Sequence, residues 1–136
     1  MKTGAAGGPD AVPLIPRSVL FGNPDRDAVR ISPDGSSLSY LAPVDGVLNV
    51  WVAPRGNLDL ARPVTHDRGR GIRLSLWAHT SSHILYLQDA GGDENWRLFS
   101  VDLRTGKERC LTPLDGVQAR LVHVSHRRPA EVVVGL

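Results

Sequence analysis

Short runs of alternating apolar and polar residues, separated by turn residues, fill most of the chain. The first such runs are residues 28–32, 37–42, 47–53 and 60–65. Alternation with a period of two is typical of β-strands that bury one face. The tripeptide Pro33-Asp34-Gly35 separates the first two runs, and these residue types favour tight turns. We therefore predict four antiparallel strands, and Pro63 places the fourth strand at an edge of the sheet.

The same pattern occurs again further along the chain. Tyr40 is followed 46 residues later by Tyr86, and Thr65 is followed 47 residues later by Thr112. A third copy begins near Leu121 and contains the run Val132-Val133-Val134. Repeats of roughly 40–50 residues with four strands each are typical of the blades of a β-propeller. The predicted fold class is therefore all-β: an incomplete β-propeller of about two and a half four-stranded antiparallel blades.

The predicted domain organisation follows from these repeats. Residues 1–13 are small and glycine-rich, which predicts a flexible N-terminal arm. Residues 14–136 form the partial propeller, with blades at about 25–66 and 70–113 and an incomplete third blade at 119–136. A propeller needs at least ~4 blades to close, so we expect the segment to pack with further blades.

The start of the third repeat also permits a different interpretation. Val117, Leu121 and Val124 have a spacing that one face of a helix would share. The alignment with the earlier repeats and the downstream Pro129 favour a strand instead.

Composition narrows the function classes. The chain has 136 residues, 22% of them charged, with a net charge of +2, and both signs are interspersed. This pattern argues against a nucleic-acid-binding surface. No stretch approaches the ~20 apolar residues that span a membrane, and no signal-peptide pattern is present, so we expect a cytoplasmic protein without membrane contact. The single cysteine, Cys110, excludes an intrachain disulfide and is interpreted as a structural or exposed thiol.

Several motifs carry a family resemblance. The string Ser-Pro-Asp-Gly-Ser-Ser-Leu-Ser-Tyr at residues 32–40 resembles the repeat of TolB-like and WD40-like propellers. Residues 15–24, 48–52 and 86–98, the last including Gly-Asp-Glu-Asn-Trp-Arg-Leu, are similar to the start of prolyl oligopeptidase-family (S9) serine peptidases, most of all the acylaminoacyl-peptidase-like branch. The resemblance covers residues 14–136. It implies an N-terminal propeller that restricts the access of short peptides to a C-terminal α/β-hydrolase domain bearing a Ser-Asp-His triad.

The residues present supply none of that chemistry. A nucleophile of this type needs a Gly-x-Ser-x-Gly elbow, and the nearest string, Gly35-Ser36-Ser37-Leu38, lacks the second glycine and a following helix. We therefore predict no catalytic residue, no cofactor and no activity for this chain alone. Its expected partners are a short peptide, the missing propeller blades and the hydrolase domain. The alternative is a TolB-like propeller module that binds a protein or ligand without catalysis.

One acidic loop is the candidate binding site. In some members of the family that the motifs resemble, propeller acids hold the amino terminus of the substrate. By that analogy Asp93 and Glu94 are candidate substrate-binding residues. The competing interpretation is a long hairpin loop whose Asp and Asn residues tolerate unusual backbone angles.

We predict no metal site. Residues 89–95 lack the alternating oxygen ligands of a calcium loop. The pairs His79/His83 and His123/His126 are interpreted as solvated histidines at turns, since zinc needs further ligands.

Two further patterns receive structural interpretations. The basic run at residues 68–73 has no aromatic residue nearby that could stack on a base, and we interpret it as a solvated connector between blades. Trp51, Trp77 and Trp96 lie on or next to predicted strands, so we expect them to pack within the blades rather than form a ligand platform.

Overall fold

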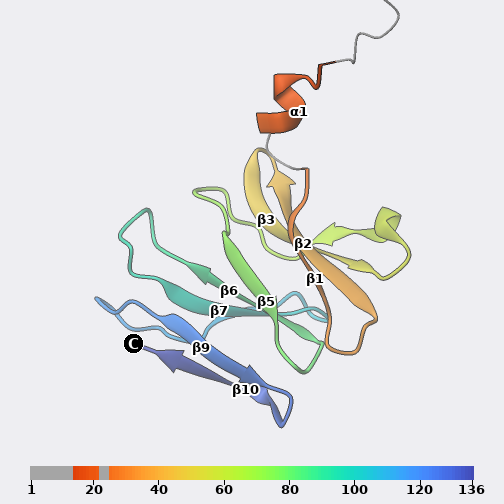
Figure 1. The fold of residues 1–136 in the computed structure, drawn as a ribbon. Coiled ribbons are helices and arrows are strands. Elements are labelled where there is room, and N and C mark those ends of the chain that lie inside the picture. The colour runs from red at the N-terminus through yellow and green to blue at the C-terminus, as the bar shows by residue number, and fades with distance from the viewer. Residues whose placement is uncertain (1–13, 22–24) are drawn as a thin grey trace, which may run out of the picture.

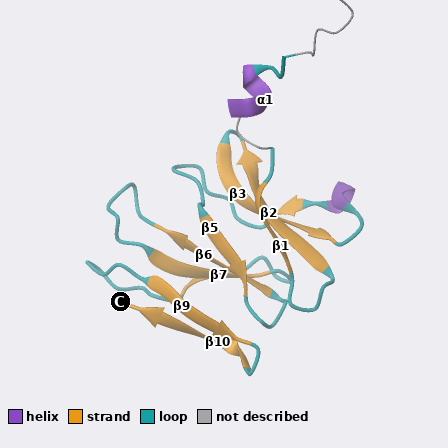
Figure 2. Cartoon of the chain, in the orientation of Figure 1, coloured by secondary structure: helices purple, strands orange, loops and turns teal. Residues whose placement is uncertain are grey.

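Three antiparallel sheets follow one another along the chain (Figure 1). The structure is a computed structural model, and it describes residues 14–21 and 25–136. Strands dominate these residues, with only two short helical segments (Figure 2). The predicted flexible arm, residues 1–13, lies outside the described residues.

The first sheet is a meander in the order β1-β2-β3-β4. Its strands are β1 (Asp27–Ile31), β2 (Ser37–Val44), β3 (Val47–Pro54) and β4 (Arg62–Pro63). The predicted fourth strand at residues 60–65 is shorter than expected, because Leu58–Leu60 form a 3-10 turn, η1. The side chain of Asn57 begins this turn by accepting a hydrogen bond from the backbone N–H of Asp59 at 3.2 Å.

The second sheet repeats the first, and the third sheet begins the pattern again. The second contains β5 (Leu74–Trp77), β6 (His83–Gln88), β7 (Arg97–Asp102) and β8 (Glu108–Cys110), in that order. The third contains β9 (Arg120–Ser125) and β10 (Arg128–Gly135). The helical alternative for residues 117–124 is wrong, since Leu121 pairs with Val134 and Val124 with Val132 in an antiparallel ladder. The predicted partial propeller is confirmed.

The turn between β1 and β2 is held by one carboxylate. The Asp34 carboxylate accepts hydrogen bonds from Ser32 Oγ at 2.6 Å and from the backbone N–H and Oγ of Ser36 at 3.0 and 2.8 Å. These hydrogen bonds, that from Ser32 foremost, hold the pKa of Asp34 below its usual value. Gly35 has a φ of +72°, which glycine adopts without a steric penalty. The Ser-Pro-Asp-Gly pattern thus forms the tight turn that the sequence predicts.

Apolar side chains fill the space between neighbouring sheets. One cluster joins the first and second sheets and consists of Leu41, Val50, Val52, Val64, Ile72, Trp77, Ile84, Tyr86 and Val101. A second cluster joins the second sheet to β9 and β10, around Ala78, Leu85 and Leu98. Neighbouring blades therefore bury the faces that they turn toward each other, as the repeat requires.

A short helix, α1 (Arg17–Phe21), precedes the sheets and has no counterpart among the sequence predictions. The backbone N–H of Val19 bonds to the carbonyl of Pro16 at 2.9 Å, which begins the turn. Its apolar residues stay outside the core: Val19 is 71% exposed and Leu20 58% exposed. Among the residues that the structure describes, no helix has the length and apolar character needed to cross a membrane.

Candidate functional site

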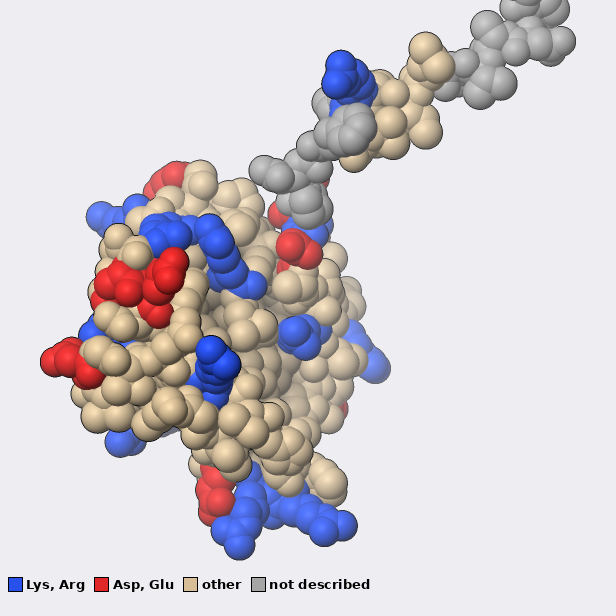
Figure 3. Space-filling model, turned by 60° about the vertical axis from the view of Figure 1, so that its left-hand side comes forward, with Lys and Arg blue, Asp and Glu red and all other residues tan. Residues whose placement is uncertain are grey.

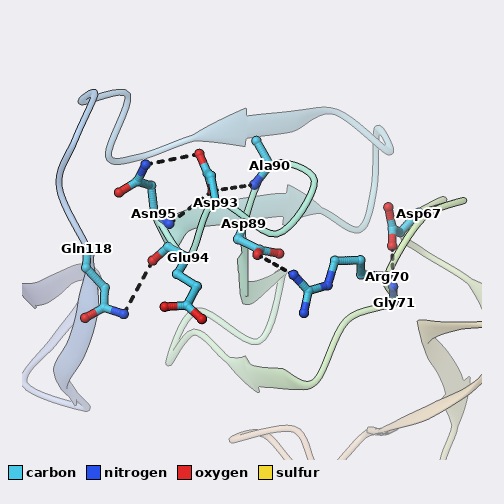
Figure 4. Close-up of polar contacts among 9 residues, drawn as sticks. All are labelled: Asp67, Arg70, Gly71, Asp89, Ala90, Asp93, Glu94, Asn95 and Gln118. Atoms are coloured by element: carbon cyan, nitrogen blue, oxygen red, sulfur yellow. Dashed lines mark hydrogen bonds and ion pairs between the residues drawn. The ribbon is translucent and has the colours of Figure 1, made fainter.

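The loop between β6 and β7, residues 89–96, carries both predicted site residues (Figure 4). It begins where β6 leaves the second sheet and ends at Trp96, next to the first residue of β7. The two connectors between blades contact it, residues 64–73 from one side and residues 111–119 from the other. Its position is therefore defined by three consecutive blades.

The carboxylate of Asp93 accepts its hydrogen bonds from within the loop itself. Its carboxylate accepts hydrogen bonds from the backbone N–H groups of Ala90 and Asn95, at 3.1 and 3.0 Å, and from Asn95 Nδ2 at 3.1 Å. Partial desolvation opposes ionisation, but these hydrogen bonds outweigh it and hold the pKa of Asp93 below its usual value. Asp93 is thus an ionised carboxylate that shapes the turn.

The environment of the Glu94 side chain differs from that of Asp93, although the two residues are adjacent in the chain. It is exposed, and its backbone has a φ of +56°, in the left-handed region that side-chain-bearing residues rarely adopt. Within the described residues its carboxylate has no hydrogen-bond or ion-pair partner, whereas its backbone carbonyl accepts from Gln118 Nε2 at 3.4 Å. Figure 4 shows the Glu94 side chain pointing away from the Asp93 carboxylate. The carboxylate of Glu94 is therefore available to a ligand, whereas the carboxylate of Asp93 is engaged in hydrogen bonds within the loop.

An ion pair fastens the loop to the connector between the first two blades. Arg70 Nη1 lies 3.1 Å from Asp89 Oδ2, and the Asp89 side chain is only 3% exposed. The connector is itself bent by Asp67, whose Oδ2 accepts a hydrogen bond from the Gly71 backbone N–H at 2.6 Å. At Gly92, with a φ of +93°, a Cβ would collide with Arg70 Nη1. Glycine at this position lets the guanidinium reach Asp89.

The interpretation of residues 68–73 as a solvated connector is wrong for its central part. Ile72 is fully buried in the cluster between the first two sheets, and its backbone N–H donates to the Leu48 carbonyl at 2.8 Å. Arg70 is engaged in the ion pair with Asp89. The run looked solvated because its charges outnumber its one large apolar residue, and the partner Asp89 is too distant in sequence to be recognised.

The histidines come together in a pairing that the sequence did not predict. The rings of His79 and His126 lie 6.3 Å apart, edge to face, at the turns of neighbouring blades. Over residues 14–21 and 25–136, no group of three or more His, Cys, Asp or Glu side chains has an arrangement that could hold a metal ion.

The tryptophans take packing roles in the blades. Trp51 stacks on Tyr40 with ring centroids 6.5 Å apart, and Trp77 is buried between the first two sheets. Trp96 is half-buried at the end of the acidic loop. Cys110 lies on β8, the outermost strand of the second sheet, and is half-buried.

Comparison with known proteins finds relatives in sequence and in structure. No family model matches the chain. It is 50% identical over 123 residues to dipeptidyl aminopeptidase BIII of Pseudoxanthomonas mexicana, a match that covers 90% of this chain and 18% of that protein. It is 34% identical over 94 residues to dipeptidyl peptidase family member 6 of Caenorhabditis elegans, covering 68% of this chain and 13% of that protein. This chain is a propeller segment related to those of S9 peptidases. It spans less than a fifth of the length of these two relatives.

Solved structures agree on the fold. The β-propeller domain of the trilobed protease from Pyrococcus furiosus matches with a TM-score of 0.56 at 18% identity, covering 81% of this segment and 34% of that chain. An acylaminoacyl peptidase matches at 0.54 and 16% identity, covering 81% and 20%. TolB from Acinetobacter baumannii matches at 0.51 and 22% identity, covering 65% and 22%. The segment therefore has the propeller fold that its repeats predicted.

Proposed function

We propose that this segment is part of the propeller of a serine peptidase that releases dipeptides from the amino end of short peptides. The observation that carries this proposal is the 50% identity over 123 residues to a dipeptidyl aminopeptidase. The chain itself contains no Gly-x-Ser-x-Gly elbow. The covalent chemistry thus belongs to an α/β-hydrolase domain outside the segment, and the segment contributes to the walls that restrict which peptides reach that domain.

Glu94 gives the segment a direct role in selecting substrates. A peptidase that cuts after the second residue must register the free amino group, and a fixed carboxylate binds an ammonium group by a charge-assisted hydrogen bond. The Glu94 carboxylate is exposed and without a partner in the described structure, on a loop fixed by Arg70 on one side and Gln118 on the other. Asp93 supports this arrangement through its hydrogen bonds within the loop.

The test is Glu94→Gln in the full-length protein that contains this segment. We expect kcat/KM for a dipeptidyl anilide with a free amino group to fall at least about tenfold, the effect of losing ~1.4 kcal/mol of binding. The same substrate with an acetylated amino group should already be poor and should change little. Glu131→Gln is the matched control, because Glu131 is an exposed glutamate paired only with Arg128 on β10.

Two results would contradict the proposal. Equal losses with free and acetylated substrates would mean that Glu94 does not recognise the amino group. Failure of the wild-type protein to hydrolyse any dipeptidyl substrate would reject the peptidase assignment and favour the non-catalytic binding module.

A further inference from the structure

Two arginines occupy equivalent positions in consecutive blades. Arg73 directly precedes β5, and Arg120, 47 residues later, begins β9. Both are exposed, and both line one open pocket of about 370 Å³. The remaining walls of this pocket are formed by Leu74, Leu87, Trp96, Gln118 and Ala119. The repeat thus places two cations at the rim of one largely apolar hollow.

These two arginines differ from their neighbours in lacking a carboxylate partner. Arg70 pairs with Asp89 and Arg97 pairs with Asp115, each at 3.1 Å. Within the part of the chain that the structure describes, neither Arg73 nor Arg120 forms an ion pair. The charges of both guanidinium groups are therefore uncompensated at the pocket. Figure 3 shows, on the face it displays, some basic side chains beside acidic ones and other basic side chains that stand apart from them.

The pocket lies directly beside the acidic loop. Arg120 Nη2 donates to Gln118 Oε1 at 3.3 Å, and Gln118 Nε2 donates to the Glu94 carbonyl at 3.4 Å. The backbone N–H of Ala119 also donates to the Trp96 carbonyl at 2.7 Å. One connector therefore joins the cationic pocket to the loop that presents the Glu94 carboxylate.

The apolar wall indicates what accompanies an anion in this pocket. Leu74 is 41% exposed, although it begins a strand, and Trp96 is half-buried. An isolated inorganic anion would leave this apolar surface in water. A carboxylate attached to an apolar group would satisfy both features, since guanidinium groups bind carboxylates and the apolar wall gains from burial.

We propose that this pocket binds the terminal carboxylate of a short peptide. Arg73 and Arg120 hold the carboxylate, while Leu74 and Trp96 contact the last apolar side chain. The inference rests on the proposed function, because it assigns the carboxyl end of the peptide whose amino end Glu94 is proposed to hold. It also predicts a preference for short peptides, since the two ends must reach two neighbouring sites.

The experiment compares matched peptides on the full-length protein that contains this segment. We would measure kcat/KM for one apolar tetrapeptide with a free terminal carboxylate, for its terminal amide, and for a dipeptidyl anilide. In Arg73→Gln/Arg120→Gln, the free acid should lose about tenfold, mainly through KM. The amide and the anilide should stay within about twofold. Arg104→Gln/Arg109→Gln is the control, because both of those arginines are exposed in the second blade and lie outside the pocket.

A second measurement needs no variant. For the wild-type protein, raising the salt concentration from 0.05 to about 0.5 M should raise KM for the free acid more than for the amide, because salt screens exposed charges. Equal losses for acid and amide in the double variant, or none, with the anilide still hydrolysed, would overturn the inference and leave the proposed function intact. Absence of anilide hydrolysis by the wild-type protein would instead reject the proposed function.

Discussion

The two spaces between neighbouring sheets differ sharply in how completely they are filled. Between the first and second sheets, Val50, Ile72 and Ile84 are fully buried. Between the second and third sheets, Leu98 of the second sheet is also fully buried, but Val132 and Val134, which β10 contributes, are only partly buried. Both spaces are formed by the same repeat, so the difference arises from the number of strands that cover each face.

The number of strands in each sheet explains why the two interfaces are filled to different extents. Four strands cover each side of the first space, whereas β9 and β10 alone cover the second sheet on its other side. An open pocket of about 190 Å³ lies next to β10, between Leu85, Leu111 and Val132. Within this segment, the interface between the two four-stranded sheets is therefore more completely packed than the interface with the two-stranded sheet.

The largest expected effect on stability comes from a cavity created between the first and second sheets. Ile84→Ala should lower the free energy of unfolding by about 3 kcal/mol, because it leaves a cavity among fully packed neighbours. Val132→Ala should cost at most about 1 kcal/mol, since Val132 is partly solvated and borders an open pocket. Urea unfolding of both variants of this chain checks the difference. Equal losses of unfolding free energy in the two variants would show that the two interfaces between sheets are packed alike, which would contradict the comparison.

A smaller effect comes from a pair of equivalent threonines. Thr65 Oγ1 accepts from the Val50 backbone N–H at 2.8 Å and donates to Asn49 Oδ1 at 2.9 Å. Among the residues that the structure describes, Thr112 Oγ1 has one hydrogen bond, which it accepts from the Leu98 backbone N–H at 2.9 Å. Thr65→Val should therefore cost about 2 kcal/mol and Thr112→Val about 1 kcal/mol, because a buried polar group without a partner is destabilising. The same unfolding assay measures both, and a larger loss for Thr112→Val would refute the explanation.

The sequence predicted the regular parts of this fold and missed the contacts between distant residues. Alternation and turn chemistry identify the strands, because both depend on neighbours in the chain. The extent of β4 was mistaken, since Asn57 redirects the chain into η1 through a local capping bond that alternation does not reveal. The short helix α1 was missed for a similar reason, as one turn of five residues leaves no periodic pattern.

The candidate site was predicted only as a pair of adjacent acids. Sequence alone could not separate their roles, because the hydrogen bonds that occupy Asp93 depend on how the loop closes. The ion pair between Arg70 and Asp89 joins residues 19 positions apart. The link from Glu94 to Gln118 crosses between blades. The repeat could have directed attention to Arg73 and Arg120, whose spacing matches that of Thr65 and Thr112.

The smallest expected effect is local and depends on pH. Hydrogen bonds, that from Ser32 foremost, lower the pKa of Asp34 from its model-peptide value of 3.8. The stabilisation they give is therefore present above about pH 4 and is lost as the pH falls through the lower, folded-state pKa. Hydrogen exchange should show the Ser36 amide, which donates to Asp34, losing protection only as the pH falls through that lowered pKa, below 3.8. The Ser82 amide, in the equivalent turn of the second blade, donates to Thr80 Oγ1 and should not respond.

The most direct test of the whole account is the rate at which the full-length wild-type protein releases dipeptides from a free-amine tetrapeptide. The account predicts dipeptide release that is abolished by acetylation of the amino group and by a serine-directed inhibitor. Unchanged release after acetylation, or no release at all from any short peptide, would contradict it.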